Sequence, residues 1–313
     1  EQFRKPGTLI TSNTSGIPIE MMTEGRSEDF NKNFCGTHFF NPPRYLRLFE
    51  IIPSTKTDPE IVKFFENYAD LFLGKTPVLC KDTPAFIANR VGVFSMAAIF
   101  KLQGEMGLSV ADIDGLTGSL TGKPKSATFR TADVVGLDTI IKVAKGVYDN
   151  CPSDEMRDTF DVPAYVLKME ENKWLGDKTK QGFYKKTKDE NGKKVILQLD
   201  LEKFEYVPSV KSKFASVAAA RQAPDLKGRL KAIAAGKDNA ADFLNRLSYM
   251  IFQYVSNRIP EISDELYRID DAMRAGFGWE IGPFEQWETV GVEKTVEKMK
   301  AAGYAPAKWV DEM

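Results

Sequence analysis

Short apolar runs recur along the first 83 residues of the chain, and turn-forming residues separate them. The runs are rich in β-branched and aromatic residues, which is typical of strands. We predict strands at Thr8–Ser12, Phe34–Phe40, Leu48–Ile52 and Pro77–Cys80. The first run resembles an interior strand of a sheet, which needs neighbouring strands. We therefore expect those neighbours to come from elsewhere in the parent protein.

One amphipathic segment lies between the third and fourth runs. Asp58 is a suitable N-cap residue, and Pro59 occupies the first helical position. Gly74 is placed to end the helix. Apolar residues recur at helical spacing at Ile61, Phe64, Phe65, Tyr68, Leu71 and Phe72. Alternating strands and a helix predict that residues 1–83 are the end of an α/β sheet domain.

The pattern changes to longer helices from Pro84 onward. Residues 176–206 are charged and irregular, with one predicted strand at Val195–Leu199. Residues 207–237 are rich in alanine and lysine, and predict a connector with one or two surface helices. We predict the main helices at Ala85–Glu105, Asp133–Tyr148, Pro163–Glu171 and Asp242–Arg258.

The helical part of the chain repeats itself at an offset of 155 or 156 residues. The matched landmarks are Asn89-Arg90-Val91 with Asn245-Arg246-Leu247, Ile113-Asp114 with Ile269-Asp270, and Gly136 with Gly291. The alternative is that any two helical pairs look alike, but three landmarks in the same order favour duplication. We predict a mainly α protein with an α/β N-terminal portion. Its segments are residues 1–83, a first helical domain at 84–205, a connector at 206–237 and a second helical domain at 238–313.

Composition excludes several classes of function. A net charge of -1 gives no basic surface for nucleic acid or an anionic membrane. The longest apolar run is far shorter than the roughly 20 residues that span a bilayer. Three cysteines, Cys35, Cys80 and Cys151, are far apart and lack metal-binding spacing. They indicate free thiols, a cytoplasmic location and no metal site.

The chain contains a single histidine, His38, which lies on a predicted strand among aromatic residues. A lone histidine is often structural. This one comes just before an Asn41-Pro42-Pro43 turn, and strand ends at loops are where α/β enzymes place reactive groups. We therefore treat His38 as a candidate general base.

Glu50 is the expected partner of His38. If the strands around the Pro42-Pro43 turn are antiparallel, residues whose numbers sum to 88 face each other, and His38 faces Glu50. A carboxylate buried in an apolar strand needs a partner, because burying an unpaired charge is costly. It would fix the imidazole tautomer. The alternative is a structural ion pair of Glu50 with Arg44 or Arg47.

Three further polar residues are weaker candidates for the same site. Asn13 and Ser15 follow the first strand, although an ordinary polar turn explains them equally well. Asn89 lies on an apolar helical stretch, where its amide needs a hydrogen-bonding partner. Asn245, its repeat mate, has no histidine-bearing strand before it, which leaves a structural role open for both.

Several segments together resemble the L-3-hydroxyacyl-CoA dehydrogenase family. The matching stretches are SNTSG at 12–16, GTHFFNPP at 36–43, LFE at 48–50, CKDTPAFIANR at 80–90, DID at 112–114, VGLDT at 135–139 and KTKQGFY at 178–184. The second helical domain adds one more stretch that resembles the family, Gly-Phe-Gly-Trp-Glu-Ile-Gly-Pro-Phe-Glu at 276–285. The resemblance implies the tail of a Rossmann-type NAD-binding sheet followed by two related helical domains.

The resemblance also implies a reaction, the NAD-dependent oxidation of a 3-hydroxyacyl-CoA in fatty-acid β-oxidation, and a mechanism for it. His38 would take a proton from the 3-hydroxyl of an acyl-CoA while hydride passes to NAD, and Glu50 would orient His38. Ser15 and Asn89 would bind the reacting oxygen. Asn13, Ser15, Asn41 and Lys178 would lie near the cofactor. The tandem helical domains further imply an oligomer, and fusion to or association with an enoyl-CoA hydratase.

The sequence departs from the family in two places. No Gly-x-Gly-x-x-Gly fingerprint follows a strand, so the main elements that bind NAD are expected upstream of residue 1. The first helical domain has Gly-Lys-Pro-Lys-Ser-Ala-Thr-Phe at 122–129 where the family has a Gly-Pro-Phe-Glu turn. Two alternatives stay open: a hydroxy-acid dehydrogenase whose substrate lacks CoA, and a non-catalytic assembly module of a multienzyme complex.

Overall fold

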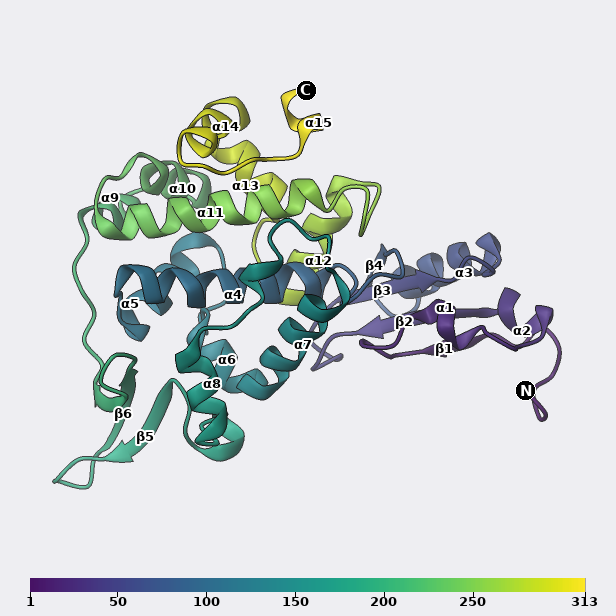
Figure 1. The fold of residues 1–313 in the computed structure, drawn as a ribbon, viewed down its shortest axis with the longest axis horizontal. Helices are drawn as coiled ribbons and strands as arrows, with labels where there is room; N and C mark the ends of the chain where they lie inside the picture. Colours follow the sequence, from purple (N-terminus) through teal and green to yellow (C-terminus); the bar gives the residue numbers. More distant parts are fainter. Residues whose placement is uncertain (313) are drawn as a thin grey trace. The chain divides into compact units, whose positions relative to one another are not determined.

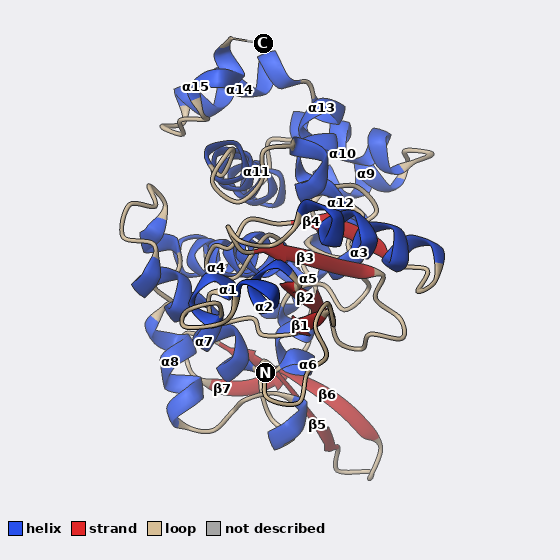
Figure 2. Cartoon of the chain, turned by 90° about the vertical axis from the view of Figure 1, so that its right-hand side faces the viewer, coloured by secondary structure: helices blue, strands red, loops and turns tan. Residues whose placement is uncertain are grey.

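A computed structural model describes residues 1–312 of the chain. Its contacts group into two compact units, each described here by itself. The first unit contains Glu1–Gly92, Tyr254–Glu285 and the C-terminal segment from Pro306, and the second contains Val93–Gln253 and Gln286–Ala305. Each unit therefore combines parts of several segments predicted from the sequence. The predicted division into two related helical domains stays a prediction. The strands form two separate sheets, drawn in red in Figure 2.

A four-stranded mixed sheet organises the first unit, at the purple end of the chain in Figure 1. The strands lie in chain order, with parallel, antiparallel and parallel pairings in turn. They are β1 (Ile10–Ser12), β2 (Phe34–Phe39), β3 (Leu48–Pro53) and β4 (Thr76–Leu79). All four predicted strands are confirmed, with ends that differ by one or two residues.

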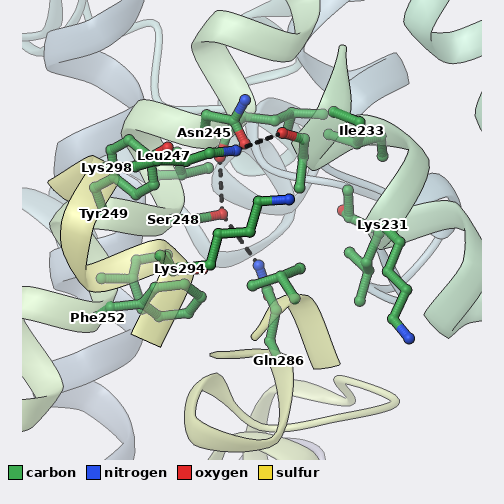
Figure 3. Close-up of a pocket in the computed structure, with 18 of the residues that line it drawn as sticks. Lys231, Ile233, Asn245, Leu247, Ser248, Tyr249, Phe252, Gln286, Lys294 and Lys298 are labelled. Atoms are coloured by element: carbon green, nitrogen blue, oxygen red, sulfur yellow. Dashed lines mark hydrogen bonds between the residues drawn. The ribbon is translucent and has the colours of Figure 1, made fainter. Parts of the chain in front are cut away.

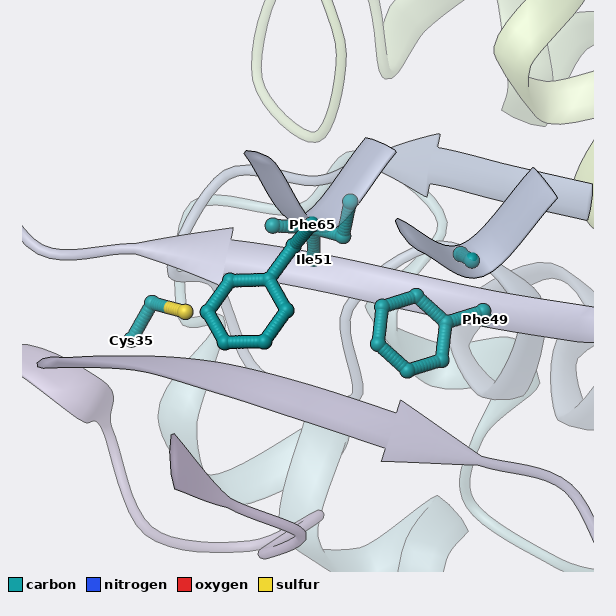
Figure 4. Close-up of a cluster of buried hydrophobic side chains, with 5 residues drawn as sticks. Cys35, Phe49, Ile51 and Phe65 are labelled. Atoms are coloured by element: carbon teal, nitrogen blue, oxygen red, sulfur yellow. The ribbon is translucent and has the colours of Figure 1, made fainter. Parts of the chain in front are cut away.

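Helix α3 (Pro59–Leu71) packs on this sheet as its sequence predicts. The Asp58 carboxylate caps the helix by accepting a hydrogen bond from the Glu60 N–H, and Gly74 adopts a positive φ of 61° just beyond its end. Phe65 and Ala69 turn inward. They form the small core of Figure 4 with Cys35, Phe49 and Ile51, which burial of apolar surface stabilises. The short helices α1 (Ile19–Met22) and α2 (Glu28–Lys32) connect β1 to β2.

Helices make up most of the remaining chain. The first set is α4 (Ala88–Met106), α5 (Val110–Leu116), α6 (Phe129–Val135), α7 (Leu137–Asn150) and α8 (Ala164–Glu171). The connector contributes α9 (Ala215–Arg221) and α10 (Leu226–Ala235). The second set is α11 (Asn239–Asn257), α12 (Leu266–Phe277), α13 (Pro283–Val290), α14 (Val292–Ala301) and α15 (Lys308–Asp311). Short 3-10 turns occupy Ser119–Thr121, Arg157–Thr159 and Asp177–Thr179.

Three details of the sequence prediction are wrong. The helix predicted at Asp133–Tyr148 is two helices, because Gly136 has a φ of 100° that a helix cannot accommodate. Helix α4 begins at Ala88 and not at Ala85. The region 176–206 contributes to an antiparallel three-stranded sheet and not one strand: β5 (Tyr184–Lys188), β6 (Lys194–Asp200) and β7 (Glu205–Pro208).

The predicted repeat is visible in hydrogen bonds. The Asp114 carboxylate accepts hydrogen bonds from the N–H groups of the residues 14 and 15 positions later, at the start of α6. Asp270 makes the same two bonds, at the same separations, at the start of α13. Gly136 and Gly291 then precede α7 and α14 with φ of 100° and 92°. The two helical segments are therefore built alike.

A second sign of the repeat is a pair of crossed ion pairs. Arg90 on α4 contacts Glu261, which follows α11, at 3.0 Å. Arg246 on α11 forms an ion pair with Glu105 at the end of α4. The offset of 156 residues converts Arg90 into Arg246 and Glu105 into Glu261. Each arginine therefore pairs with the glutamate of the other repeat.

Among residues 1–312, no helix combines the length and apolar character needed to cross a membrane. Cys35, Cys80 and Cys151 are buried free thiols, as predicted.

Candidate active site

His38 and Glu50 occupy facing positions on β2 and β3. The register of these antiparallel strands pairs His38 with Glu50 and Gly36 with Ile52, so the predicted sum of 88 is confirmed. His38 Nδ1 lies 2.7 Å from Glu50 Oε2. The glutamate is fully buried and the histidine is 7% exposed. The alternative, an ion pair of Glu50 with Arg44 or Arg47, is not formed within residues 1–312.

The second oxygen of Glu50 binds the start of α4. Glu50 Oε1 accepts hydrogen bonds from the N–H of Ala88 at 2.9 Å and of Ile87 at 3.2 Å. The first N–H groups of a helix have no partner within the helix, so a buried carboxylate satisfies them and interacts favourably with the helix dipole. Ala85 and Phe86 reach this geometry with φ of 65° and 52°, in the left-handed region. This turn explains why α4 begins later than predicted.

Two aromatic rings hold the imidazole of His38. Phe40 and Phe86 contact it edge-on, with ring centroids at 5.1 Å and 5.5 Å. Glu50 accepts at Nδ1, which assigns the proton to Nδ1 and leaves the lone pair on Nε2. Nε2 makes no hydrogen bond within the described part of the chain. The arrangement leaves one nitrogen of a positioned imidazole able to accept a proton.

Asn13, Ser15 and Asn41 lie at strand ends and are exposed. Asn13 follows β1, and its Oδ1 accepts a hydrogen bond from the N–H of Phe39 at 2.9 Å, which places this residue beside His38. Ser15 lies two residues further along the same loop. Asn41 lies two residues after the end of β2. The structure therefore brings the loop after β1 to the strand end that carries His38.

Asp82 is a positioning residue that sequence reasoning missed. Its carboxylate accepts hydrogen bonds from the N–H groups of Ile19 at 2.9 Å and Glu20 at 2.7 Å. It thereby ties the segment that follows the Ser15 loop to the segment that leads into α4. The only signal in the sequence is an aspartate in the Cys80–Arg90 motif, and its partner more than 60 residues away could not be inferred.

Asn89 lies in the first turn of α4, one residue after the N–H bound by Glu50. Its amide is partly exposed and makes no hydrogen bond within residues 1–312. Asn245, its repeat mate, lines a pocket in the second unit. The interaction predicted for the Asn89 amide inside the protein is therefore not formed, and the amide remains able to bind a ligand.

Lys178 belongs to the second unit, where its ammonium group forms an ion pair with Asp138. This pair lowers the pKa of Asp138. The remaining predicted site residues, His38, Glu50, Ser15, Asn89, Asn13 and Asn41, all belong to the first unit.

A dinucleotide binds outside the carboxyl ends of neighbouring parallel strands in folds of this class. β1 and β2 form such a pair, and Asn13, Ser15 and Asn41 follow their carboxyl ends. These polar groups fit the nicotinamide end of NAD. No Gly-x-Gly-x-x-Gly loop, the motif that cradles a pyrophosphate in such folds, occurs in the sequence.

Comparison with known proteins gives a consistent family. The model of the 3-hydroxyacyl-CoA dehydrogenase NAD binding domain matches residues 1–83, and that of the C-terminal domain of the same family matches residues 86–186. The chain is 44% identical over its whole length to a probable 3-hydroxyacyl-CoA dehydrogenase of Bacillus subtilis, of which it covers 39%. It is 29% identical over 90% of its length to a putative fatty acid oxidation complex trifunctional enzyme of Rickettsia felis, of which it covers 38%.

The chain thus spans about two fifths of the length of these two relatives. In fold it resembles the crystal structure of 3-hydroxybutyryl-CoA dehydrogenase from Escherichia coli, with a TM-score of 0.70, 20% identity, and coverage of 98% of this chain and 75% of that one. The motifs read from the sequence and the matches to both family domains agree: the chain belongs to the 3-hydroxyacyl-CoA dehydrogenase family.

Proposed function

We propose that this chain carries the proton-transfer pair of an NAD-dependent L-3-hydroxyacyl-CoA dehydrogenase. The observation that carries the proposal is the buried contact between His38 Nδ1 and Glu50 Oε2. A carboxylate that holds one imidazole nitrogen leaves the other nitrogen as a base of fixed direction. His38 is the single histidine of the chain, so no other imidazole is present to act as this base.

His38 Nε2 accepts the proton of the substrate 3-hydroxyl, and Glu50 stabilises the imidazolium that forms. Ser15 and Asn89 donate hydrogen bonds to the reacting oxygen and hold the substrate carbon in place. Asn13, Ser15 and Asn41 bind the nicotinamide end of the cofactor. NAD, when bound, supplies the hydride acceptor for the oxidation of the alcohol to the ketone.

Acyl-CoA thioesters of fatty-acid β-oxidation are the substrates that fit the family. An enoyl-CoA hydratase, fused or associated, is the partner we propose, because the trifunctional relative is named for a fatty acid oxidation complex. We further propose a cytoplasmic, oligomeric protein. The alternatives without CoA or without catalysis have no observation in their favour.

The test uses the natural full-length polypeptide with L-3-hydroxybutyryl-CoA and NAD, the direction in which His38 accepts a proton. His38→Ala is expected to lower kcat by about 10²–10⁴-fold, the usual contribution of a general base. Unchanged activity in a folded variant would support a non-catalytic assembly role instead. Free 3-hydroxy acids serve as the comparison substrates.

A further inference from the structure

The second unit contains a pocket of about 300 Å³ that the proposed function does not use. Helices α10, α11, α13 and α14 and the segment around Lys123 supply its lining. Apolar side chains form much of the wall, including Leu230, Ile233, Leu247 and Phe252. Small-molecule sites start at about this volume and combine apolar walls with a few placed polar groups.

Four lysines line the same pocket, and no lining side chain is a carboxylate. They are Lys123, Lys231, Lys294 and Lys298. Lys294 and Lys298 are one turn apart on α14 and so project from one face of the helix. In Figure 3 the side chain of Lys294 extends across the middle of the view, whereas the ammonium group of Lys231 points away to the lower right. Lys294 and Lys298 therefore stand beside an apolar wall, and the pocket lining contains no acidic residue.

Polar contacts fix the geometry of this lining. Ser248 donates to the carbonyl of Leu244 at 2.8 Å and accepts from Gln286 Nε2 at 3.1 Å. Lys298 Nζ reaches the carbonyl of Ala234 at 3.3 Å. Burial lowers the pKa of Lys123 to about 8.

We propose that this pocket binds an aliphatic carboxylate of about eight carbons, with its carboxylate at Lys294 and Lys298 and its chain along the apolar wall. A cavity of about 300 Å³ is at the lower end of the range for small-molecule sites, which suits a ligand as small as octanoate. The cations select the charged end, and the apolar wall selects a hydrocarbon body over a small inorganic anion. The proposal is independent of the His38–Glu50 site.

Isothermal titration of the chain with sodium octanoate tests the proposal. Ten atoms at ordinary ligand efficiency correspond to a Kd on the order of 0.1–1 mM. Acetate supplies the anion without the chain, octan-1-ol supplies the chain without the anion, and octyl phosphate replaces the carboxylate. Octanoate is expected to bind at least ten times more tightly than acetate or octan-1-ol, and octyl phosphate, which keeps both the chain and the anion, is expected to bind as well.

The double variant Lys294→Gln/Lys298→Gln is expected to weaken octanoate binding at least tenfold. Both lysines are exposed residues, so the variant should fold, and circular dichroism checks this. Lys300→Gln, an exposed residue on the same helix that does not line the pocket, is the matched control and should bind like the parent chain. Absence of octanoate binding, equal binding of the double variant, or equal binding of acetate or octan-1-ol would each overturn the proposal.

Discussion

Replacement of Glu50 by glutamine tests the role of the buried pair most directly, because the side chain keeps its shape and loses its charge. Glu50 accepts three hydrogen bonds: one from His38 through Oε2 and two from backbone N–H groups through Oε1. A glutamine has one oxygen and one NH₂ group, so it can accept on only one of these two sides. The choice between the two orientations decides the effect.

The orientation with the oxygen toward the backbone is favoured. The reverse orientation would set the NH₂ group against two buried N–H donors, and each unsatisfied group costs about 1–3 kcal/mol. The NH₂ group therefore faces His38 Nδ1, which must then accept, and the imidazole proton moves to Nε2. The proposed base is lost, so kcat should fall by about 10²–10⁴-fold, or ~2.7–5.4 kcal/mol, with a much smaller change in KM.

The assay follows NADH formation from L-3-hydroxybutyryl-CoA and NAD in the natural full-length polypeptide, the direction in which His38 accepts the proton. Exchange of charged for neutral hydrogen bonds should also lower the free energy of unfolding by about 1 kcal/mol, and Tm by ~2–4 °C. Glu60→Gln is the matched control, because Glu60 is exposed on α3 and pairs only with Lys63 at the surface. A Glu50→Gln variant that is folded and retains kcat within threefold would refute the tautomer argument.

Three further predictions concern stability. Burial, with the nearby charge of Glu285, raises the pKa of Asp270 to about 7, so the folded protein keeps a proton that the unfolded chain releases above its ordinary pKa near 3.8. The free energy of unfolding should therefore fall by up to about 1.4 kcal/mol per pH unit between pH 4 and 7. Urea titrations of Asp270→Asn at several pH values should lack this contribution. Gly291→Ala should destabilise the chain by about 1–3 kcal/mol through its φ of 92°. Gly136→Ala, with a φ of 100°, should cost a similar amount, because the atom nearest to its added methyl group is the flexible end of Lys178 at 2.9 Å; an unchanged Tm in either variant would contradict this prediction. Gly92→Ala should cost about 1–3 kcal/mol, because its methyl group would lie 2.1 Å from the ring of Phe277, and an unchanged Tm would show that the ring moves freely.

Much of the first unit could be predicted because its signals are local. The strands, the Asp58 cap and the register of His38 with Glu50 follow from short-range pattern and from the symmetry of a hairpin about its turn. The contact of Glu50 with the start of α4 could not be predicted, because it joins residues 37 positions apart. The left-handed turn at Ala85 and Phe86 was hidden because residues with a Cβ rarely adopt it.

Other errors had signals that were available. Gly136 interrupts the predicted helix, and its match with Gly291 in the repeat already marked it as a special backbone position. The Asn191–Gly192 pair between β5 and β6 is a strong hairpin signal. Lysines on these strands obscured the alternation of apolar and polar residues. The interaction of Asp82 with the N–H groups of α1 lacks any such signal.

The crossed ion pairs of Arg90 with Glu261 and of Arg246 with Glu105 have a consequence for the evolution of the family. After a duplication, the two copies of a segment usually diverge independently of each other. Here a charge lost from one copy removes an ion pair from the matching residue in the other copy, so selection acts on the two copies jointly. Among homologous sequences, position 90 should covary with position 261, and position 246 with position 105, more strongly than either arginine covaries with the glutamate of its own copy.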